Sequence, residues 1–269
     1  MKKQVIKVII IQLLAAGCCC AAANRVTADA NTVGEILQEL EQQTAKLESY
    51  EGQIEYLFSQ PLLDSKTLRK GALYYQRTGE KSLLRINFET LKQDDEPEQK
   101  YIEQYLFDGV WLTHIDYQIK TVERRQLAEP NEAMDAFELA SRNFPIVGFA
   151  ETGELEKQFE IKLIQEKTEG LTGLHLRPKA DSIYKKNYAS IEFRIDRKYY
   201  LPARITAEST EKDIYEIRLV SPKVNKGIDK AVFEAKIPAG FGEQVIPLRK
   251  EEPDGKTGVR QDGRGSVSR

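Results

Sequence analysis

The most constraining feature of this chain is a series of short segments, from residue 52 onward, in which apolar and polar side chains alternate with a period of two. These segments are rich in Tyr, Phe, Ile, Leu and Val, as β-strands are. They occupy residues 52–59, 69–77, 82–90, 101–107, 110–117, 119–126, 157–166, 171–178, 187–197, 201–209 and 212–220. Most of the connections are too short for the crossovers that parallel strands require. The pattern therefore predicts one antiparallel sheet of about eleven strands.

Turn-forming residues separate these segments, including Pro61, Gly79 and the polar stretch 93–99. The Asp108-Gly109 pair predicts a type I′ hairpin, because both central positions of that turn need positive φ. A sheet of eleven strands curls, because each strand is twisted. We therefore expect a mainly β (α+β) fold: an incompletely closed, about eleven-stranded antiparallel barrel.

Two segments with helical spacing interrupt the strand pattern. Residues 32–49 begin with a capping box, Thr32 and Glu35, and residues 131–143 have an imperfect apolar side that ends before Pro145. Both are placed to cover the concave face of the sheet as a helical lid or plug. The apolar lid residues would be Leu37, Leu40, Leu47, Met134 and Phe137.

The first residues have the layout of an export signal: Lys2 and Lys3, a short apolar run, then small residues. Residues 1–23 are predicted to be a signal peptide, or a lipoprotein leader that ends before a lipidated Cys18, as Ala15-Ala16-Gly17-Cys18 suggests. Cleavage after Ala23 or Ala30 is the alternative. The three cysteines, Cys18 to Cys20, stand together here, so the remaining chain forms no disulfide and no thiolate site. We expect an exported, periplasmic protein, soluble or lipid-anchored, with a folded part at 31–248 and a disordered polar tail at 249–269.

Composition and motifs exclude several functions. Residues 1–23 hold three lysines and no acid, so 37 basic and 42 acidic residues follow them, interspersed and without the basic stripe that nucleic acids need. The only histidines, His114 and His175, are too few for a zinc site, and no G-x-S-x-G occurs. We predict no enzyme, no cofactor and no metal.

The remaining candidate is an apolar surface on alternating strand positions. The predicted ligand-binding residues are Leu73, Tyr75, Arg77, Leu84, Ile86, Phe88, Tyr105, Phe107, Trp111 and Ile115. Two interpretations stay open: an ordinary packed core, or the wall of a ligand-sized cavity. Arg77 ends an apolar row, where it would be either a rim cation that binds ester carbonyls or a head group, or a surface arginine.

A family resemblance spans roughly residues 33–248. It includes Phe58-x-Gln60, Gly71-x-Leu73 leading to Arg77, and the Asp108-Gly109-x-Trp111 hairpin. Later motifs are Tyr200-Leu201-Pro202 and Asn225-x-x-Ile228-Asp229-x-x-x-Phe233, followed by Pro238 and Gly240. In the order and spacing of these motifs the chain resembles the LolA/LolB type of periplasmic outer-membrane lipoprotein carriers and receptors.

The resemblance implies an unclosed barrel with a helical lid and an apolar cavity for acyl chains. It implies a monomer that takes lipidated proteins or acyl-chain lipids from an inner-membrane exporter to an outer-membrane acceptor, without an enzymatic step. Arg77 matches the family arginine that links the sheet to the lid, although Thr78 follows it where the family has proline. The alternatives are an envelope sensor or membrane-anchored receptor of the same fold, and an envelope hydrolase.

Overall fold

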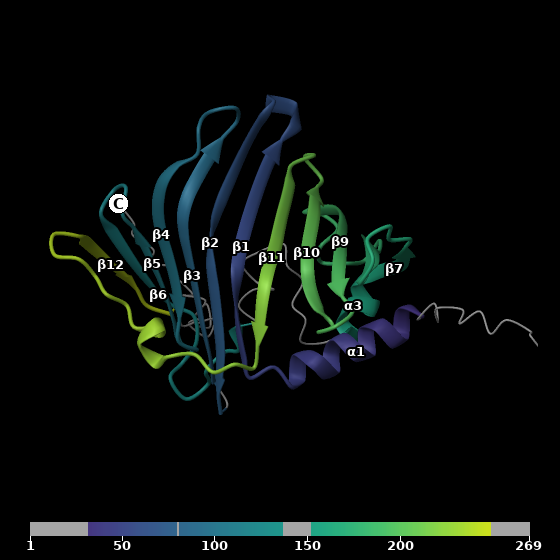
Figure 1. The fold of residues 1–269 in the computed structure, drawn as a ribbon, viewed down its shortest axis with the longest axis horizontal. Coiled ribbons are helices and arrows are strands. Elements are labelled where there is room, and N and C mark those ends of the chain that lie inside the picture. Colours follow the sequence, from purple (N-terminus) through teal and green to yellow (C-terminus); the bar gives the residue numbers. More distant parts are fainter. Residues whose placement is uncertain (1–31, 80, 137–151, 249–269) are drawn as a thin grey trace, which may run out of the picture.

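The computed structural model describes residues 32–79, 81–136 and 152–248, and these form one open, curved sheet (Figure 1). The sheet has twelve strands in the order β12-β6-β5-β4-β3-β2-β1-β11-β10-β9-β8-β7. The predicted leader with Cys18, the tail at 249–269 and the lid residue Phe137 lie outside the described residues.

The elements follow the chain in a simple order. The helices are α1 (Val33–Ala45) and α3 (Thr152–Gln158), with 3₁₀ turns η1 (Pro61–Leu63) and η2 (Lys230–Phe233). The strands are β1 (Ser49–Gln60), β2 (Ser65–Thr78), β3 (Lys81–Gln93), β4 (Gln99–Phe107), β5 (Trp111–Asp116), β6 (Thr121–Gln126), β7 (Phe159–Ile164), β8 (Leu171–Pro178), β9 (Tyr188–Asp196), β10 (Leu201–Ser209), β11 (Ile214–Val224) and β12 (Gly242–Ile246).

The predicted fold class is confirmed: the sheet is mainly antiparallel and its two ends, β12 and β7, do not pair. The eleven predicted strands correspond to β1 through β11. The twelfth, β12, pairs in parallel with β6. To reach that edge, residues 225–241 cross the sheet from β11, as Figure 1 shows in green to yellow. We call this segment the strap.

The strap packs on the convex face of the sheet, which we call the outer face. Arg85 of β3 donates hydrogen bonds to the carbonyls of Val232 (2.6 Å) and Glu234 (3.2 Å) in the strap. Phe241 packs on Tyr117 and on a small outer core of Leu106, Ile115 and Val122. The strap is thus fastened across the strands that it crosses.

Helix α1 packs on the opposite face, which we call the inner face. Its apolar stripe contacts side chains of β7 to β10 there. Ile36, Leu37 and Leu40 are buried there among residues such as Leu174 and Phe193. The predicted capping box is present: the Thr32 hydroxyl accepts from the Glu35 amide, and the Glu35 carboxylate accepts from the Thr32 amide. Helix α3, which the sequence pattern did not predict, contributes Leu155 to the same core.

Several local predictions were wrong. The first helix ends at Ala45 instead of continuing to Ser49, because Ser49 already pairs with Gln76 as the first residue of β1. Residues 131–135 are not helical, and the rest of the predicted helix at 131–143 is mostly outside the described residues. The turn after β4 is not type I′, because Gly109 (φ 93°) has positive φ and Asp108 does not. The Asp108 carboxylate instead accepts from the backbone amides of Val110 and Trp111.

One glycine is required by a close approach of two strands. The pairing of β2 with β3 shifts register between Lys70 and Gly71. A Cβ at Gly71 would lie 1.7 Å from the carbonyl oxygen of Asn87. This bulge increases the local twist where β2 and β3 form the middle of the candidate site.

Candidate ligand-binding face

The register of β2, β3 and β4 gathers seven of the predicted ligand-binding residues on the inner face. Leu73 pairs with Ile86, which pairs with Tyr105, and Tyr75 pairs with Leu84, which pairs with Phe107. Phe88 lies in the next row and contacts Tyr105 edge to face, with ring centroids 6.4 Å apart. We call this surface the aromatic face; it consists of Leu73, Tyr75, Leu84, Ile86, Phe88, Tyr105 and Phe107.

Trp111 and Ile115 do not belong to the aromatic face, so their predicted placement was wrong. Phe107 pairs with Leu112 and Tyr105 with His114, so odd-numbered residues of β4 face the same way as even-numbered residues of β5. Ile115 is buried in the outer core. Trp111 also points outward, where its ring lies 5.2 Å from the Arg124 guanidinium carbon. The turn between β4 and β5 shifts the alternation by one residue, so the odd-even pattern of β4 cannot simply be continued into β5.

Further inner-face residues, on the strands that flank the aromatic face, were not predicted from the sequence. They are Tyr50, Ile54 and Tyr56 on β1, Leu112 on β5, and Ile217 and Leu219 on β11. The alternation of residues 52–59 marked β1 as a strand. Its pairing with β11 joins segments more than 150 residues apart and has no local signal.

The aromatic face is only partly covered by the described residues. Tyr75, Ile86, Phe88 and Phe107 are buried, whereas Leu73, Leu84 and Tyr105 are half-buried. Of the predicted lid residues, Leu37 and Leu40 pack over β7 to β10, away from this face. Leu47 and Met134 pack against Tyr75 and Phe107. The predicted lid residues are therefore divided between two cores.

A buried carboxylate interrupts the apolar rows. The Glu103 side chain on β4 is 5% exposed, and its Oε1 accepts a hydrogen bond from the Tyr105 hydroxyl (2.8 Å) and lies 2.8 Å from His114 Nε2. Its Oε2 lies 3.4 Å from Arg69 Nη1, an ion pair without a hydrogen bond. The rings of Tyr105 and His114 stack with centroids 4.4 Å apart.

Burial by itself would raise the pKa of Glu103. The hydrogen bonds from His114 and Tyr105 and the positive charge of Arg69 outweigh burial and hold this pKa below its usual value. Burial and the neighbouring carboxylate raise the pKa of Tyr105, which therefore stays a neutral donor. The negative charge of Glu103 is therefore balanced by its own neighbours: the charge of Arg69 and the hydrogen bonds with Tyr105 and His114.

Glu103, His114 and Asp116 can each direct one ligand atom to a common point, with the three atoms within 4.8 Å of one another. The Arg69 guanidinium is already paired with Glu103, and a cation at this point would compete with it. We therefore assign no metal to this group.

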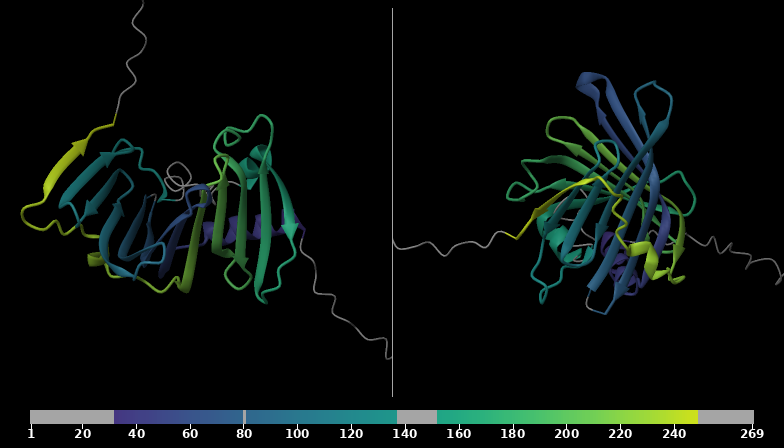
Figure 2. Two further views of the ribbon diagram at one scale, coloured as in Figure 1. Left: turned by 90° about the horizontal axis from the view of Figure 1, so that it is seen from above. Right: turned by 90° about the vertical axis from the view of Figure 1, so that its left-hand side faces the viewer.

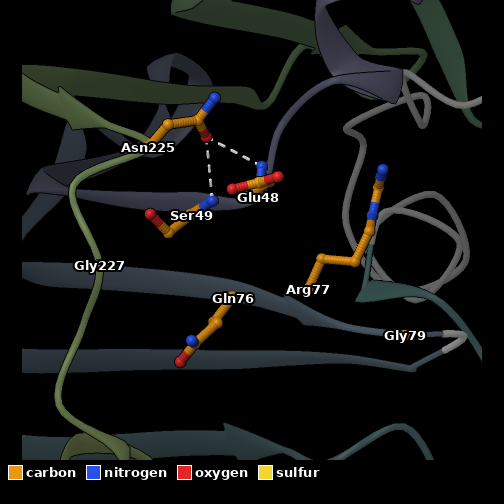
Figure 3. Close-up of a pocket in the computed structure, with 7 residues that line it drawn as sticks. All are labelled: Glu48, Ser49, Gln76, Arg77, Gly79, Asn225 and Gly227. Atoms are coloured by element: carbon orange, nitrogen blue, oxygen red, sulfur yellow. Dashed lines mark hydrogen bonds between the residues drawn. The ribbon is translucent and has the colours of Figure 1, made fainter.

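Arg77 joins the sheet to the end of α1. Its guanidinium donates to the carbonyls of Ala45 (2.5 Å) and Thr44 (3.3 Å) in the last turn of the helix, where carbonyls have no i+4 amide donor. The Thr44 carbonyl also accepts from the Leu47 amide (3.1 Å). Asn225 fastens the same link: its amide oxygen accepts from the backbone amides of Glu48 and Ser49, as Figure 3 shows. Arg77 therefore links the end of β2 to the end of α1; that this helix acts as a lid stays a prediction.

These residues surround a hollow of about 380 Å³. It is lined by Glu48, Ser49, Gln76, Arg77, Gly79, Asn225 and Gly227 (Figure 3). Its lining residues are all polar or glycine, so this hollow differs from the cavity lined by apolar side chains that the sequence predicts. Its walls are the α1–β1 link, the end of β2 and the start of the strap.

No family model and no curated protein matches the chain. Among solved structures, an uncharacterized conserved protein from Thermus thermophilus has a TM-score of 0.48 and 11% identity, covering 80% of this chain and 99% of that one. MucB of Pseudomonas aeruginosa, in complex with MucA, has a TM-score of 0.45 and 12% identity, covering 75% of this chain and 60% of that one. A LolA-superfamily protein from Nitrosomonas europaea has a TM-score of 0.35 and 13% identity, covering 77% and 99%. The likeness extends no further than the fold.

Within the described ranges, the structure contains no helix of the length and apolar character needed to span a bilayer.

Proposed function

We propose that the chain is a non-enzymatic, periplasmic binding protein for acyl chains, whose ligand lies on the aromatic face. The observation that carries the proposal is the group of half-buried side chains in two adjacent rows of the inner face: Leu73 and Tyr105 in one row and Leu84 in the next. Each methylene that leaves water on such a surface contributes about 0.8 kcal/mol. The resemblance of the sequence motifs to lipoprotein carriers supports the same ligand class.

Binding of this kind is reversible and needs no covalent step, so a comparable apolar acceptor is enough to receive the ligand. We therefore propose that lipidated proteins or acyl-chain lipids are carried between an exporter and an acceptor in the envelope. A form lipidated at Cys18 would act instead as an anchored receptor or sensor.

The test compares two adjacent leucines of β3 that face opposite sides. Leu84 lies on the aromatic face, and Leu83 points to the outer face. Leu84→Glu should weaken the binding of dansyl-undecanoic acid at least tenfold, because a carboxylate on this face is costly to desolvate. Leu83→Glu should bind as the wild type does. The assay is dansyl fluorescence in solution without vesicles, with circular dichroism to show that both variants are folded. Equal binding by both variants would remove the aromatic face as the ligand site.

A further inference from the structure

The β1–β2 hairpin ends in two leucines that almost nothing covers. Leu62 is 79% exposed and Leu63 is 70% exposed, both within η1. The hairpin beneath them is paired up to Gln60 and Ser65, so the tip is presented on a regular ladder. Together with the β3–β4 hairpin, it extends beyond the rest of the sheet in the right-hand view of Figure 2.

Two further exposed side chains lie at the same end of the sheet. Ile119, 69% exposed, is in the β5–β6 connection, and Ile183, 73% exposed, is in the β8–β9 connection. Strands β1, β5 and β8 run in the same direction, because four antiparallel pairings separate β1 from each of the others. Their connections therefore share one end of the sheet. The other exposed large aliphatic residues that the structure describes are between 40% and 52% exposed and lie in strands or the strap.

We propose that this end of the sheet docks on a lipid bilayer, with Leu62 and Leu63 inserted in the interfacial region. These four aliphatic side chains are 69–79% exposed, and their location at one end of the sheet points to a binding surface. A protein partner needs a contiguous, closely packed patch. Single aliphatic tips on separate connections suit a fluid bilayer, which conforms to each of them.

The charges at this end indicate which lipids matter. Lys66 and Lys120 flank the tips, but the acidic connection 93–99 lies at the same end. Within that connection, the Asp94 carboxylate accepts from the Lys66 amide and Glu98 pairs with Lys70. Acidic and basic residues are therefore interspersed at this end of the sheet. We expect the apolar side chains, more than anionic lipids, to determine the affinity.

The first experiment is co-sedimentation of the exported protein with phosphatidylcholine vesicles, with and without 20% phosphatidylglycerol. All variants carry the same processed N-terminus, so any attached acyl chain is common to them. The double variant Leu62→Glu/Leu63→Glu should bind vesicles at least tenfold more weakly. The matched control Val220→Glu, a 40% exposed aliphatic residue of β11 away from the tips, should bind as the wild type does. Equal binding by the double variant and the control would overturn the proposal.

The second experiment remains decisive if the protein is lipid-anchored. In a Trp111→Phe background, Leu62→Trp reports on the tip alone, since Trp111 is the only tryptophan of the chain. Vesicles should shift its emission to the blue, and brominated lipids should quench it. Emission that stays unchanged while the protein sediments with vesicles would show that the tip does not insert, as would be the case if it bound a protein instead. Because Leu84→Glu should retain this signal, failure of the acyl-chain site and failure of docking are distinguishable.

Discussion

At the scale of single residues, Glu103 departs most from its surroundings, because it is a buried carboxylate within apolar rows. Its folded-state pKa is below the ordinary value of 4.5, so its interactions stabilise the fold above pH 4.5 and are lost as the pH falls through the folded pKa. Glu103→Gln should lower the free energy of unfolding by about 1–3 kcal/mol at pH 7.

Urea denaturation of wild type and variant from pH 7 to pH 3 measures this effect. The difference between the two proteins should shrink below pH 4.5, because the wild-type carboxyl then also becomes neutral. Glu89→Gln, at an exposed position of β3, is the control and should change little at any pH. A difference for Glu103→Gln that is constant with pH would contradict the assigned network.

The residue scale also shows what the sequence can and cannot predict about the site. Alternation alone placed Leu73, Tyr75, Leu84 and Ile86 on a common face, because their strands alternate regularly up to the turns. It failed for Trp111, because the face of a residue after a turn depends on the register of the hairpin. Glu103 was missed for a different reason. Its partner Arg69 is 34 positions away in sequence, and without that partner a single Glu in a strand cannot be told from a solvent-exposed Glu.

At the scale of elements, α1 depends on a cation from another element. Its last turn contains no basic residue, and Arg77 of β2 supplies the charge that favours a helix C-terminus. Arg77→Gln should lower the free energy of unfolding by about 1–2 kcal/mol. Hydrogen exchange should become faster at the amides of the last turn of α1, and the β2 amides should be unaffected.

Arg77→Lys, which keeps the charge, is the control and should restore much of the protection in α1. Uniformly faster exchange in helix and sheet would mean that Arg77 stabilises the whole fold rather than the helix end. The same experiment addresses the family resemblance, in which the corresponding arginine links the sheet to the lid.

Elements whose signals are local were predicted well, and those fixed by tertiary contacts were not. The start of α1 follows from Thr32 and Glu35, and its end is set by the pairing of Ser49 with Gln76. Strand β12 has five residues and pairs with β6 only because the strap carries it across the sheet. No local pattern of apolar residues indicates such a crossing.

At the scale of the whole molecule, the strap connects the middle of the open sheet to its far edge. It begins at Asn225 beside the end of α1, is fastened in its middle by Arg85, and ends at the far edge beside β6. Arg85 also donates to the side chains of Asn87 and Gln104, so each of its three guanidinium nitrogens donates to β3, β4 or the strap. Burial lowers the pKa of Arg85, and these acceptors compensate for its desolvation.

Arg85→Gln should therefore release the middle of the strap and lower the free energy of unfolding by about 1.5–3 kcal/mol, the usual range for hydrogen bonds to a charged group. Limited trypsin digestion measures the release directly, because the strap contains Lys226, Lys230 and Lys236. Cleavage there should be faster in Arg85→Gln than in Arg125→Gln, which removes only an exposed ion pair with Glu123. Equal cleavage in the two variants would mean that the pairing of β12 with β6 holds the strap without Arg85.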